Sequence, residues 1–249
     1  MKLSVQLYSI RGVGDFAAQL ALARSTGFEW VETVATHNLS PQDFAAKVAQ
    51  HGVKVSSMHA GLRLLDTERD QIIEACRLTR CPLVIMPWME LANRPLTGEG
   101  WSRLGGRLAA IGRELAPHGI RLAYHNHDFE FFPYEGKIAL EWLFADTTPA
   151  DLGWEADLGW VRRAGADPKK WLGRLQPYLS AVHAKDIAGE GLNVDQDGWC
   201  VLGQGMMDWR DLLTYLQDKV DVIVFEHDAP KEPAATLRDS FAFMHGALG

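Results

Sequence analysis

Short apolar runs alternate with longer amphipathic segments along the whole chain. The runs, rich in β-branched and aromatic residues, predict buried strands, and the segments with apolar residues three and four positions apart predict helices. The predicted strands are Leu3–Tyr8, Phe28–Val34, Val53–His59, Pro82–Pro87, Ile120–His127, Leu152–Asp157, Leu179–His183 and Val222–Glu226. The predicted helices are Asp15–Thr26, Ser40–His51, Thr67–Thr79, Gly100–Pro117, Ile138–Ala145, Pro168–Leu175, Trp209–Lys219 and Pro233–Leu248.

The alternation of eight strands with eight helices is typical of a parallel sheet whose helices return the chain to the same end. Over 249 residues it favours an α/β fold of the closed (β/α)8 TIM barrel type over an open sheet. No linker or change of composition interrupts the pattern, so we expect a single domain over residues 1–249. In such a barrel the active site lies at the carboxyl ends of the strands.

Polar residues are concentrated at these strand ends. The strands close with Glu32, with His59, with His125 and His127, with Asp157, with His183 and with Glu226. Residues two apart on a strand share a face, so His125 and His127 point the same way if their strand continues that far. Taken singly, a histidine here can be a hydrogen-bonded structural residue, Asp157 can cap the next helix, and Glu32 can pair with a nearby Lys or Arg.

Strands five to eight are neighbours around the barrel, so their ends converge on one place. His125, Asp157, His183 and Glu226 would supply imidazole and carboxylate ligands of the kind that Zn²⁺, Mn²⁺, Co²⁺ and Fe²⁺ prefer. We therefore expect these four residues to bind one divalent metal ion (Mn, Zn, Co, Mg or Fe). Because no thiol joins the set, a Lewis-acid role is favoured over a structural zinc site.

Two further charged residues lie close to the predicted metal. If the chain stays extended, Lys185 shares the face of His183 and can contact a substrate oxygen; a solvated salt bridge to Asp186 is the alternative. Glu155 also faces inward, and a carboxylate inside a barrel needs a partner or a proton.

Several aromatic residues and one long loop are candidate parts of a substrate pocket. Strand ends and loops carry Trp88, Trp154, Trp160 and Trp199. Aromatic walls suit the apolar faces of a sugar, and ordinary core packing is the alternative for each tryptophan. The segment from Ala184 to Asp208 is unusually long and rich in glycine, which is compatible with a functional lid or with a flexible insertion.

Charge and composition exclude some classes of protein. The formal net charge of -7 and the pI of about 5.7 disfavour nucleic acid as a partner. The start of the chain lacks the apolar region of a signal peptide, and no apolar run approaches a membrane span. Three cysteines, Cys76, Cys81 and Cys200, lack metal-finger spacing and are expected to be reduced thiols. Together these features predict a cytoplasmic protein without a membrane partner.

The segment Tyr124–Phe131, with the sequence Tyr-His-Asn-His-Asp-Phe-Glu-Phe, resembles the strand-five signature of the sugar phosphate isomerase/epimerase family of xylose-isomerase-like barrels. Further segments resemble other parts of the same family: Gln6–Arg11, Asp157–Trp160 with Arg163–Pro168, His183–Asp186, and Gly203–Gly205 with Asp208-Trp209. The resemblance covers the whole chain. It is specific for the superfamily and does not name a substrate.

The resemblance implies that a divalent metal binds vicinal oxygens of a sugar or cyclitol, and that metal and base together acidify a C–H bond next to a carbonyl. His125 stands where family epimerases carry a strand-five glutamate, and Ile187-Ala188-Gly189 replaces a segment that carries an arginine there. A reaction with one base therefore fits better than a symmetric mechanism with two glutamates. Such reactions include aldose–ketose isomerisation, and elimination as in inosose dehydratase and in lyases that cleave 3-keto-glycosides.

By this resemblance the metal stabilises an enediolate while Glu226 or His127 takes the proton. Lys185 or His59 then orients a substrate oxygen. Glu32 and two tryptophans, Trp88 and Trp160, are expected to line the substrate site.

The first expectation is an isomerase or epimerase, and the alternative is a lyase or dehydratase. A non-catalytic sugar-binding barrel and a phosphodiesterase like endonuclease IV are further alternatives; the latter needs more metal ligands and a basic face. No Gly-rich phosphate loop precedes a helix, so a phosphorylated substrate is not favoured. The family often pairs its barrels, which leaves a homodimer open.

Overall fold

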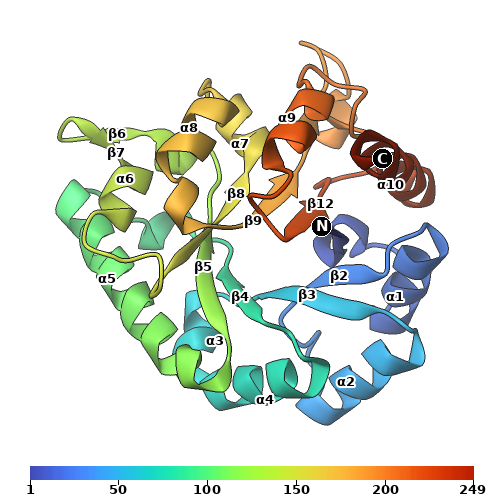
Figure 1. The fold of residues 1–249 in the computed structure, drawn as a ribbon, viewed down its shortest axis with the longest axis horizontal. Helices are drawn as coiled ribbons and strands as arrows, with labels where there is room; N and C mark the ends of the chain where they lie inside the picture. The colour runs from blue at the N-terminus through green and yellow to red at the C-terminus, as the bar shows by residue number, and fades with distance from the viewer.

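The computed structural model describes residues 1–249 and shows a closed parallel barrel of eight strands surrounded by helices (Figure 1). The barrel strands are β1 (Lys2–Gln6), β2 (Trp30–Val34), β3 (Lys54–His59), β4 (Leu83–Met86), β5 (Arg121–His125), β8 (Gly153–Asp157), β9 (Leu179–Ala184) and β12 (Val222–Phe225). β1 pairs with both β2 and β12, which closes the barrel. The predicted TIM barrel is confirmed.

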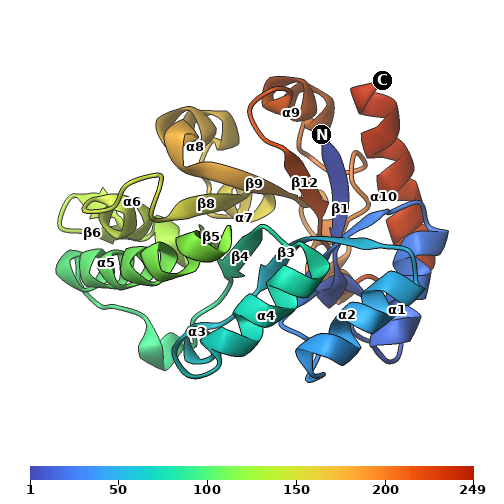
Figure 2. The same cartoon turned by 60° about the horizontal axis from the view of Figure 1, so that its bottom comes forward.

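Ten α-helices follow one another around the barrel, and α10 returns to the side of β1 (Figure 2). They are α1 (Phe16–Ser25), α2 (Pro41–Gln50), α3 (Leu62–Thr67), α4 (Arg69–Thr79), α5 (Gly98–Leu115), α6 (Ala139–Phe144), α7 (Leu158–Arg163), α8 (Pro168–Arg174), α9 (Trp209–Leu216) and α10 (Pro233–Leu248). The sequence did not predict α3 and α7, which have six residues each. Helices of this length show only a weak hydrophobic period. α6 is as short but was predicted, because its buried residues Ala139, Leu140, Leu143 and Phe144 keep helical spacing.

Smaller elements lie in the connections. They are the 3-10 turns η1 (Leu7–Ile10), η2 (Leu91–Asn93), η3 (Ala116–His118), η4 (Phe129–Phe131), η5 (Gln176–Tyr178) and η6 (Val194–Gln196), and the two-stranded sheets β6–β7 (Pro133–Tyr134, Lys137–Ile138) and β10–β11 (Asp186–Ile187, Trp199–Cys200). The three cysteines are free and buried.

Local sequence signals set several helix ends. The Ser40 hydroxyl accepts a hydrogen bond from the backbone N–H of Asp43, and Pro41 is the first residue of α2. Gly27, after α1, has φ = 110°, a conformation that only glycine adopts readily. A Cβ atom at this position would lie 2.6 Å from the ring of Phe241 on α10. Gly27 therefore permits both the turn and the close approach of α10.

The interior of the barrel changes from apolar to polar along the strands. Its amino-terminal half is filled by a cluster of six buried residues: Leu83, Ile85, Ala123, Ala181, Val222 and Val224. Because residues two apart share a face, the next inward positions on β5, β9 and beyond β12 are His125, His183 and Glu226. A separate core of 57 buried residues packs the helices onto the outside of the strands. The polar side chains thus converge above a closed apolar floor.

The strand that carries His125 is shorter than the sequence predicted. β5 ends at His125, and the chain then turns, so His127 lies outside the strand. The side-chain oxygen of Asn126 holds this turn by accepting hydrogen bonds from the indole of Trp154 (2.8 Å) and the backbone N–H of Asp157 (3.2 Å). The predicted end of this strand at His127 is therefore wrong, and the condition under which His125 and His127 would share a strand face is not met, although both line the same cavity.

The long segment 184–208 is organised around one buried carboxylate. Asp186 accepts hydrogen bonds from the backbone N–H groups of Gly203 and Gly205 (both 3.0 Å) and of Met207 (3.3 Å). A Cβ atom at position 205 would lie 2.2 Å from the Oδ1 atom of Asp186. The glycines of this segment therefore let its backbone wrap the carboxylate closely.

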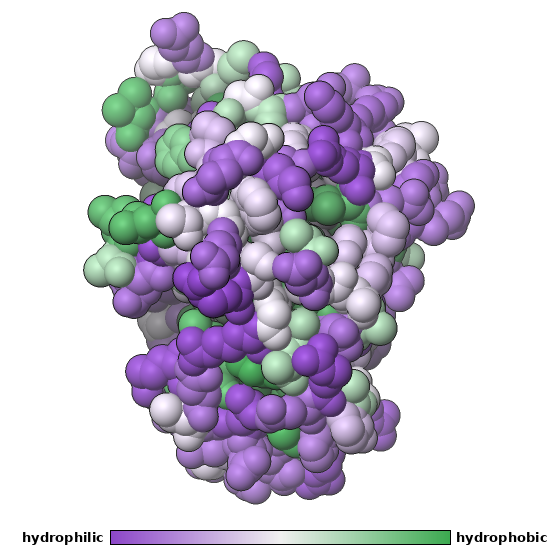
Figure 3. All heavy atoms as spheres, turned by 90° about the vertical axis from the view of Figure 1, so that its left-hand side faces the viewer, coloured by the Kyte–Doolittle hydropathy of each residue, from purple (hydrophilic) through white to green (hydrophobic).

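The outer surface is mixed in character. Figure 3 shows the face that carries β6, β7 and α6, where hydrophilic side chains predominate and the hydrophobic ones form small separate groups. The helices are all too short or too polar to cross a bilayer.

Candidate metal centre and active site

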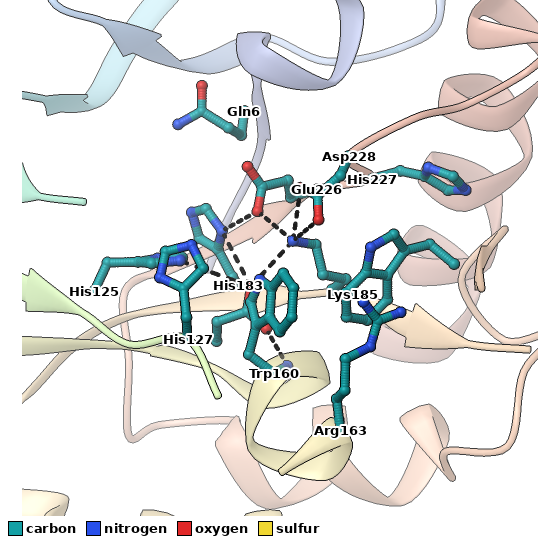
Figure 4. A network of polar contacts seen from close by, with 12 residues as sticks. Gln6, His125, His127, Trp160, Arg163, His183, Lys185, Glu226, His227 and Asp228 are labelled. Carbon is teal, nitrogen blue, oxygen red and sulfur yellow. Dashed lines mark hydrogen bonds and ion pairs between the residues drawn. The ribbon is translucent and has the colours of Figure 1, made fainter. Parts of the chain in front are cut away.

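The carboxyl ends of four neighbouring strands bring together the four residues that the sequence predicted as metal ligands. His125, Asp157, His183 and Glu226 are all buried, and each offers one ligand atom within 4.8 Å of the other three. Figure 4 shows His125, His183 and Glu226 close together. β5, β8, β9 and β12 are consecutive in the barrel, which explains the convergence. This set is called the upper group below. Its two imidazoles and two carboxylates could hold a metal ion.

Asp157 supplies the clearest sign that the upper group suits a metal. Its Oδ1 atom accepts a hydrogen bond from the backbone N–H of Trp160 (2.8 Å) and so caps α7. Its Oδ2 atom is buried but has no hydrogen-bond partner; Lys185 Nζ lies at 3.5 Å and His183 Nδ1 at 3.8 Å. Burial raises the pKa of Asp157 to about 7. A buried oxygen without a donor is a fitting ligand for a divalent cation.

Charge balance points the same way. Five carboxylates lie in this part of the barrel, and the nearby lysine that contacts several of them is Lys185. The carboxylates belong to Glu32, Glu155, Asp157, Glu226 and Asp228. Negative charge of this density is costly in a protein interior unless positive charge accompanies it. Protonated histidines and a divalent ion are the charges that these side chains can accommodate.

A second cluster lies directly beneath, and we call it the lower group: Glu32, His59 and Glu155. Glu155 Oε2 lies 3.0 Å from His59 Nε2 and 3.0 Å from His125 Nδ1. Glu32 Oε1 lies 2.8 Å from His59 Nε2. Burial lowers the pKa of His59, but the nearby Glu32 and Glu155 outweigh it and raise that pKa to about 9, so His59 stays protonated. Glu155 thus has the partners that the sequence left unnamed.

Glu32 does not lie where its predicted role requires. It is fully buried, and its carboxylate accepts hydrogen bonds from the side chains of Gln6 and Ser57. Its charged partners are histidines and not the Lys or Arg considered from the sequence. Direct contact between Glu32 and a substrate therefore has no support in this geometry.

A cavity of about 470 Å³ opens above the upper group. Five of the residues that the sequence assigned to the substrate or to catalysis line it: His59, Trp88, His127, Trp160 and Glu226. His125 and Glu226 form its polar end, and Tyr8, Val34, Leu64 and Pro87 form an apolar wall. The cavity therefore joins a hydrogen-bonding end to an apolar and aromatic side.

His127 lies in this cavity as an uncharged imidazole. Its ring packs edge-on against Trp88 (4.7 Å between centroids) and His125 (4.8 Å). Burial lowers the pKa of His127 well below its usual value, and the charge of Lys185 lowers it further. The Nδ1 atom of His127 has no hydrogen-bond partner. Because the ring lines the cavity and is uncharged, His127 is a candidate acceptor for a proton from a molecule there.

Lys185 is buried behind the cavity. Its Nζ atom lies 2.8 Å from Glu226 Oε2 and 2.8 Å from Asp228 Oδ1, with the Trp160 and Trp199 rings about 5 Å away. Burial lowers the pKa of Lys185, but the charges of Glu226, Asp228 and Asp157 outweigh it and raise that pKa above its usual value. Lys185 is thus a fixed cation. The alternative of a salt bridge to Asp186 is wrong.

A family model described as Xylose isomerase-like TIM barrel matches residues 20–246. The chain belongs to this family. Among curated proteins, the chain is 26% identical over 155 residues to inosose dehydratase 1 of Bacillus cereus. This match covers 57% of this chain and 51% of that protein. The chain thus spans about half the length of the curated relatives it matches.

Solved structures share the xylose isomerase-like fold over nearly the whole chain. A sugar phosphate isomerase/epimerase from Parabacteroides distasonis superimposes with a TM-score of 0.80 at 18% identity, covering 97% of this chain and 92% of that one. The IolI protein with a binding zinc atom gives a TM-score of 0.74 at 15% identity, with 100% and 98% covered. At these identities the likeness shows the fold.

The structure adds functional candidates that the sequence analysis missed in this xylose isomerase-like barrel. Asp228 lines the cavity and lies two residues after Glu226. Had the last predicted strand been extended to Asp228, the alternation of its residues would have pointed to this carboxylate. Tyr8 lines the cavity just beyond β1. Glu130, within the strand-five signature, is not one of these candidates, because it does not line the cavity; it accepts hydrogen bonds from the Tyr124 hydroxyl (2.6 Å) and the backbone N–H of His127 (2.7 Å) and so holds the turn after β5.

Glu130→Gln is expected to remove a pH-dependent loss of stability. Burial raises the pKa of Glu130 from 4.5 to about 8. Between these values the unfolded chain has released the proton that the folded chain retains, so the free energy of unfolding falls as pH rises, by about 1.4 kcal/mol per unit. A glutamine cannot ionise, so the variant should gain about 2 kcal/mol over the wild type between pH 6 and 7.5. Urea unfolding across this range measures the gain, and parallel stability curves would contradict it.

Proposed function

We propose that the protein is a metal-dependent lyase that removes a proton next to a carbonyl of an unphosphorylated cyclic polyhydroxy ketone and then eliminates water. The observation that carries this proposal is the His127 imidazole, which lines the cavity and whose ring centre lies 4.8 Å from that of His125 in the upper group. The similarity to inosose dehydratases over half of the chain supports elimination. The zinc of the IolI neighbour supports a metal in such a barrel.

The residues of the upper group would hold one divalent ion, of the set Mn, Zn, Co, Mg and Fe, through His125 Nε2, His183 Nδ1 and one oxygen each of Asp157 and Glu226. When bound, such an ion supplies a Lewis acid that polarises a carbonyl and binds a neighbouring hydroxyl. A substrate oriented at these residues has its carbonyl-adjacent carbon near His127. The apolar wall of Val34 and Leu64 then covers the less polar face of the ring.

In the proposed reaction His127 does the proton chemistry. The imidazole takes the proton from the carbon next to the carbonyl, and the electron pair of that C–H bond forms a carbon–carbon double bond. The C–O bond to the hydroxyl on the following carbon breaks, and this hydroxyl leaves as water with the proton that His127 carried. A positioned histidine typically contributes about 10²–10⁴-fold to such a step. Lys185 holds Glu226 and Asp228 in place and stays charged throughout.

Isomerisation, the reaction expected first from the sequence, is the second candidate. The observation that favours it is the same single imidazole, since His127 can return its proton to the neighbouring carbon. A sugar phosphate fits less well. The cavity lining contains one protonated histidine, His59, and no arginine or lysine to bind a phosphate.

Incubation with an inosose in deuterated water tests the proposal. The metal-loaded protein should incorporate deuterium next to the carbonyl and form the unsaturated ketone, which is followed by its ultraviolet absorbance. Chelation followed by dialysis should abolish turnover, and restoring the metal should recover it. Aldose–ketose conversion without loss of water would select the isomerase. Ligand binding without exchange would indicate a non-catalytic barrel, and cleavage of an abasic duplex would indicate a phosphodiesterase.

A further inference from the structure

Three imidazole nitrogens converge on two carboxylate oxygens in the lower group. His183 Nε2 lies 2.6 Å from Glu32 Oε1 and 3.1 Å from Glu155 Oε2. His59 Nε2 lies 2.8 Å and 3.0 Å from the same two oxygens. His125 Nδ1 lies 3.0 Å from Glu155 Oε2. All five side chains come from different strands and are at most 8% exposed, so water competes little for these contacts.

His125 and His183 therefore each have two distinct faces. His125 turns Nδ1 down to Glu155 and Nε2 up toward Asp157 Oδ2, at 3.9 Å. His183 turns Nε2 down to the lower carboxylates and Nδ1 up to Glu226 Oε2, at 3.1 Å. A neutral imidazole carries one N–H, and we place it on the nitrogen with the nearer carboxylate oxygen: Nδ1 of His125, at 3.0 Å against 3.9 Å for Nε2, and Nε2 of His183, at 2.6 Å against 3.1 Å for Nδ1. The other nitrogen of each ring then presents a lone pair.

We propose that Glu155 is a positioning residue that fixes His125 and His183 in the tautomers whose lone pairs meet in the upper group. The proposal rests on the metal centre of the proposed function and goes beyond it, because Glu155 lies outside the upper group. His59, His125, Glu155 and His183 form a second set that could hold an ion, and this set is the competing role for Glu155. Glu155 is the carboxylate within reach of His125 Nδ1. His183 Nε2 is shared with Glu32, which Gln6 and Ser57 hold from below.

The location of Glu155 argues against a role in stability alone. Its side chain is fully buried, and its Oε1 atom has no hydrogen-bond partner. A buried, incompletely satisfied carboxylate next to Glu32 costs free energy that an apolar residue would avoid. The cluster of small apolar side chains one step below shows that this barrel can be filled without charge. Carboxylates that accept the second N–H of a metal-binding histidine are a general feature of metal sites.

The affinity of the folded protein for a metal ion tests whether Glu155 positions the two histidines or serves only stability. Glu155→Gln keeps the shape of the side chain and can keep an acceptor oxygen at the position of Oε2, but it removes the negative charge that strengthens the hydrogen bonds from the imidazoles. We expect the dissociation constant for Zn²⁺, measured by competition with a chelator, to rise about 10–100-fold. The visible spectrum of the Co²⁺-loaded protein should change with the altered ligand set. Glu130→Gln is the matched control, since Glu130 is equally buried but contacts Tyr124 and the His127 backbone; its Zn²⁺ affinity should stay within about twofold of the wild type.

Several results would overturn the proposal. Unchanged affinity and an unchanged Co²⁺ spectrum in Glu155→Gln would leave Glu155 without a positioning role. Two ions bound per wild-type chain, one of them lost in Glu155→Gln, would make the lower group a second metal site. Should Glu155→Gln not fold, Glu155→Asp keeps the charge and is expected to fold with weakened Zn²⁺ binding; failure of both to fold would assign Glu155 to stability.

The proposed reaction and the proposed role of Glu155 can be refuted by different results. A wild-type protein that binds Zn²⁺ but converts no polyhydroxy ketone refutes the proposed reaction and still allows the affinity comparison. A wild-type protein that binds no divalent ion refutes both.

Discussion

Asp157→Asn is expected to abolish metal binding at the upper group and to lower kcat by about a thousandfold or more, because a Lewis acid contributes several kcal/mol to such a step. The substitution is chosen because it preserves the second task of Asp157. The amide oxygen can still accept the hydrogen bond from the Trp160 backbone that caps α7. The amide nitrogen replaces the partnerless Oδ2 atom and cannot bind a cation. Metal content after dialysis and turnover of an inosose measure the two effects.

Asp167→Asn provides the matched control for this experiment. Asp167 also caps a helix, α8, by accepting hydrogen bonds from the backbone N–H groups of Lys169 and Lys170, but it lies outside the cavity. Its variant should retain the wild-type metal content. Full metal occupancy in Asp157→Asn would remove Asp157 from the ligand set and with it the proposed centre.

His127→Gln is expected to lower kcat by about 10²–10⁴-fold while metal affinity stays at the wild-type value. The glutamine keeps a polar side chain in the cavity but cannot accept and return a proton at neutral pH. Deuterium exchange next to the substrate carbonyl should fall in parallel with kcat, because both depend on removal of the same proton. Pre-steady-state measurement of exchange at saturating substrate checks this.

His118→Gln is the control for the His127 variant, because His118 is an exposed histidine just before β5, at the opposite end of the barrel. It should leave turnover unchanged. If His127→Gln exchanged deuterium at the wild-type rate, the base would be another residue, and Glu226 would be the next candidate because it also lines the cavity.

The sequence predicted the direction of a side chain only where the residue lies within, or directly follows, the two-residue alternation of a strand. His183 lies within β9, and Glu226 directly follows the last residue of β12, so the alternation of their strands predicted the inward direction of both. His127 and Asp228 follow the last paired residues of β5 and β12, where the alternation no longer applies. Both nevertheless reach the cavity, and only the turns after the strands decide this.

The length of the local pattern also explains which helices the sequence predicted and which it missed. The long amphipathic helices α5 and α10 were predicted nearly to their ends, since several turns of apolar spacing make a strong signal. α7 has six residues and begins because the Asp157 carboxylate caps it. The sequence showed Asp157 as a candidate ligand or a candidate cap. The structure shows that its two oxygens divide these tasks: one caps α7, and the other is free for a ligand.

The sequence by itself determined the alternation of strands and helices, hence the barrel, and the row of polar residues at its carboxyl end. These follow from local periodicity and from the requirement that parallel strands end on one side. The tertiary structure alone decided which atom of each side chain faces which neighbour. Closure of the barrel places Glu155 and Glu32 beneath His125 and His183 from strands that are distant in the sequence. Contacts of this kind depend on how the whole barrel packs. They produce no repeating hydrophobic pattern in the sequence from which they could be predicted.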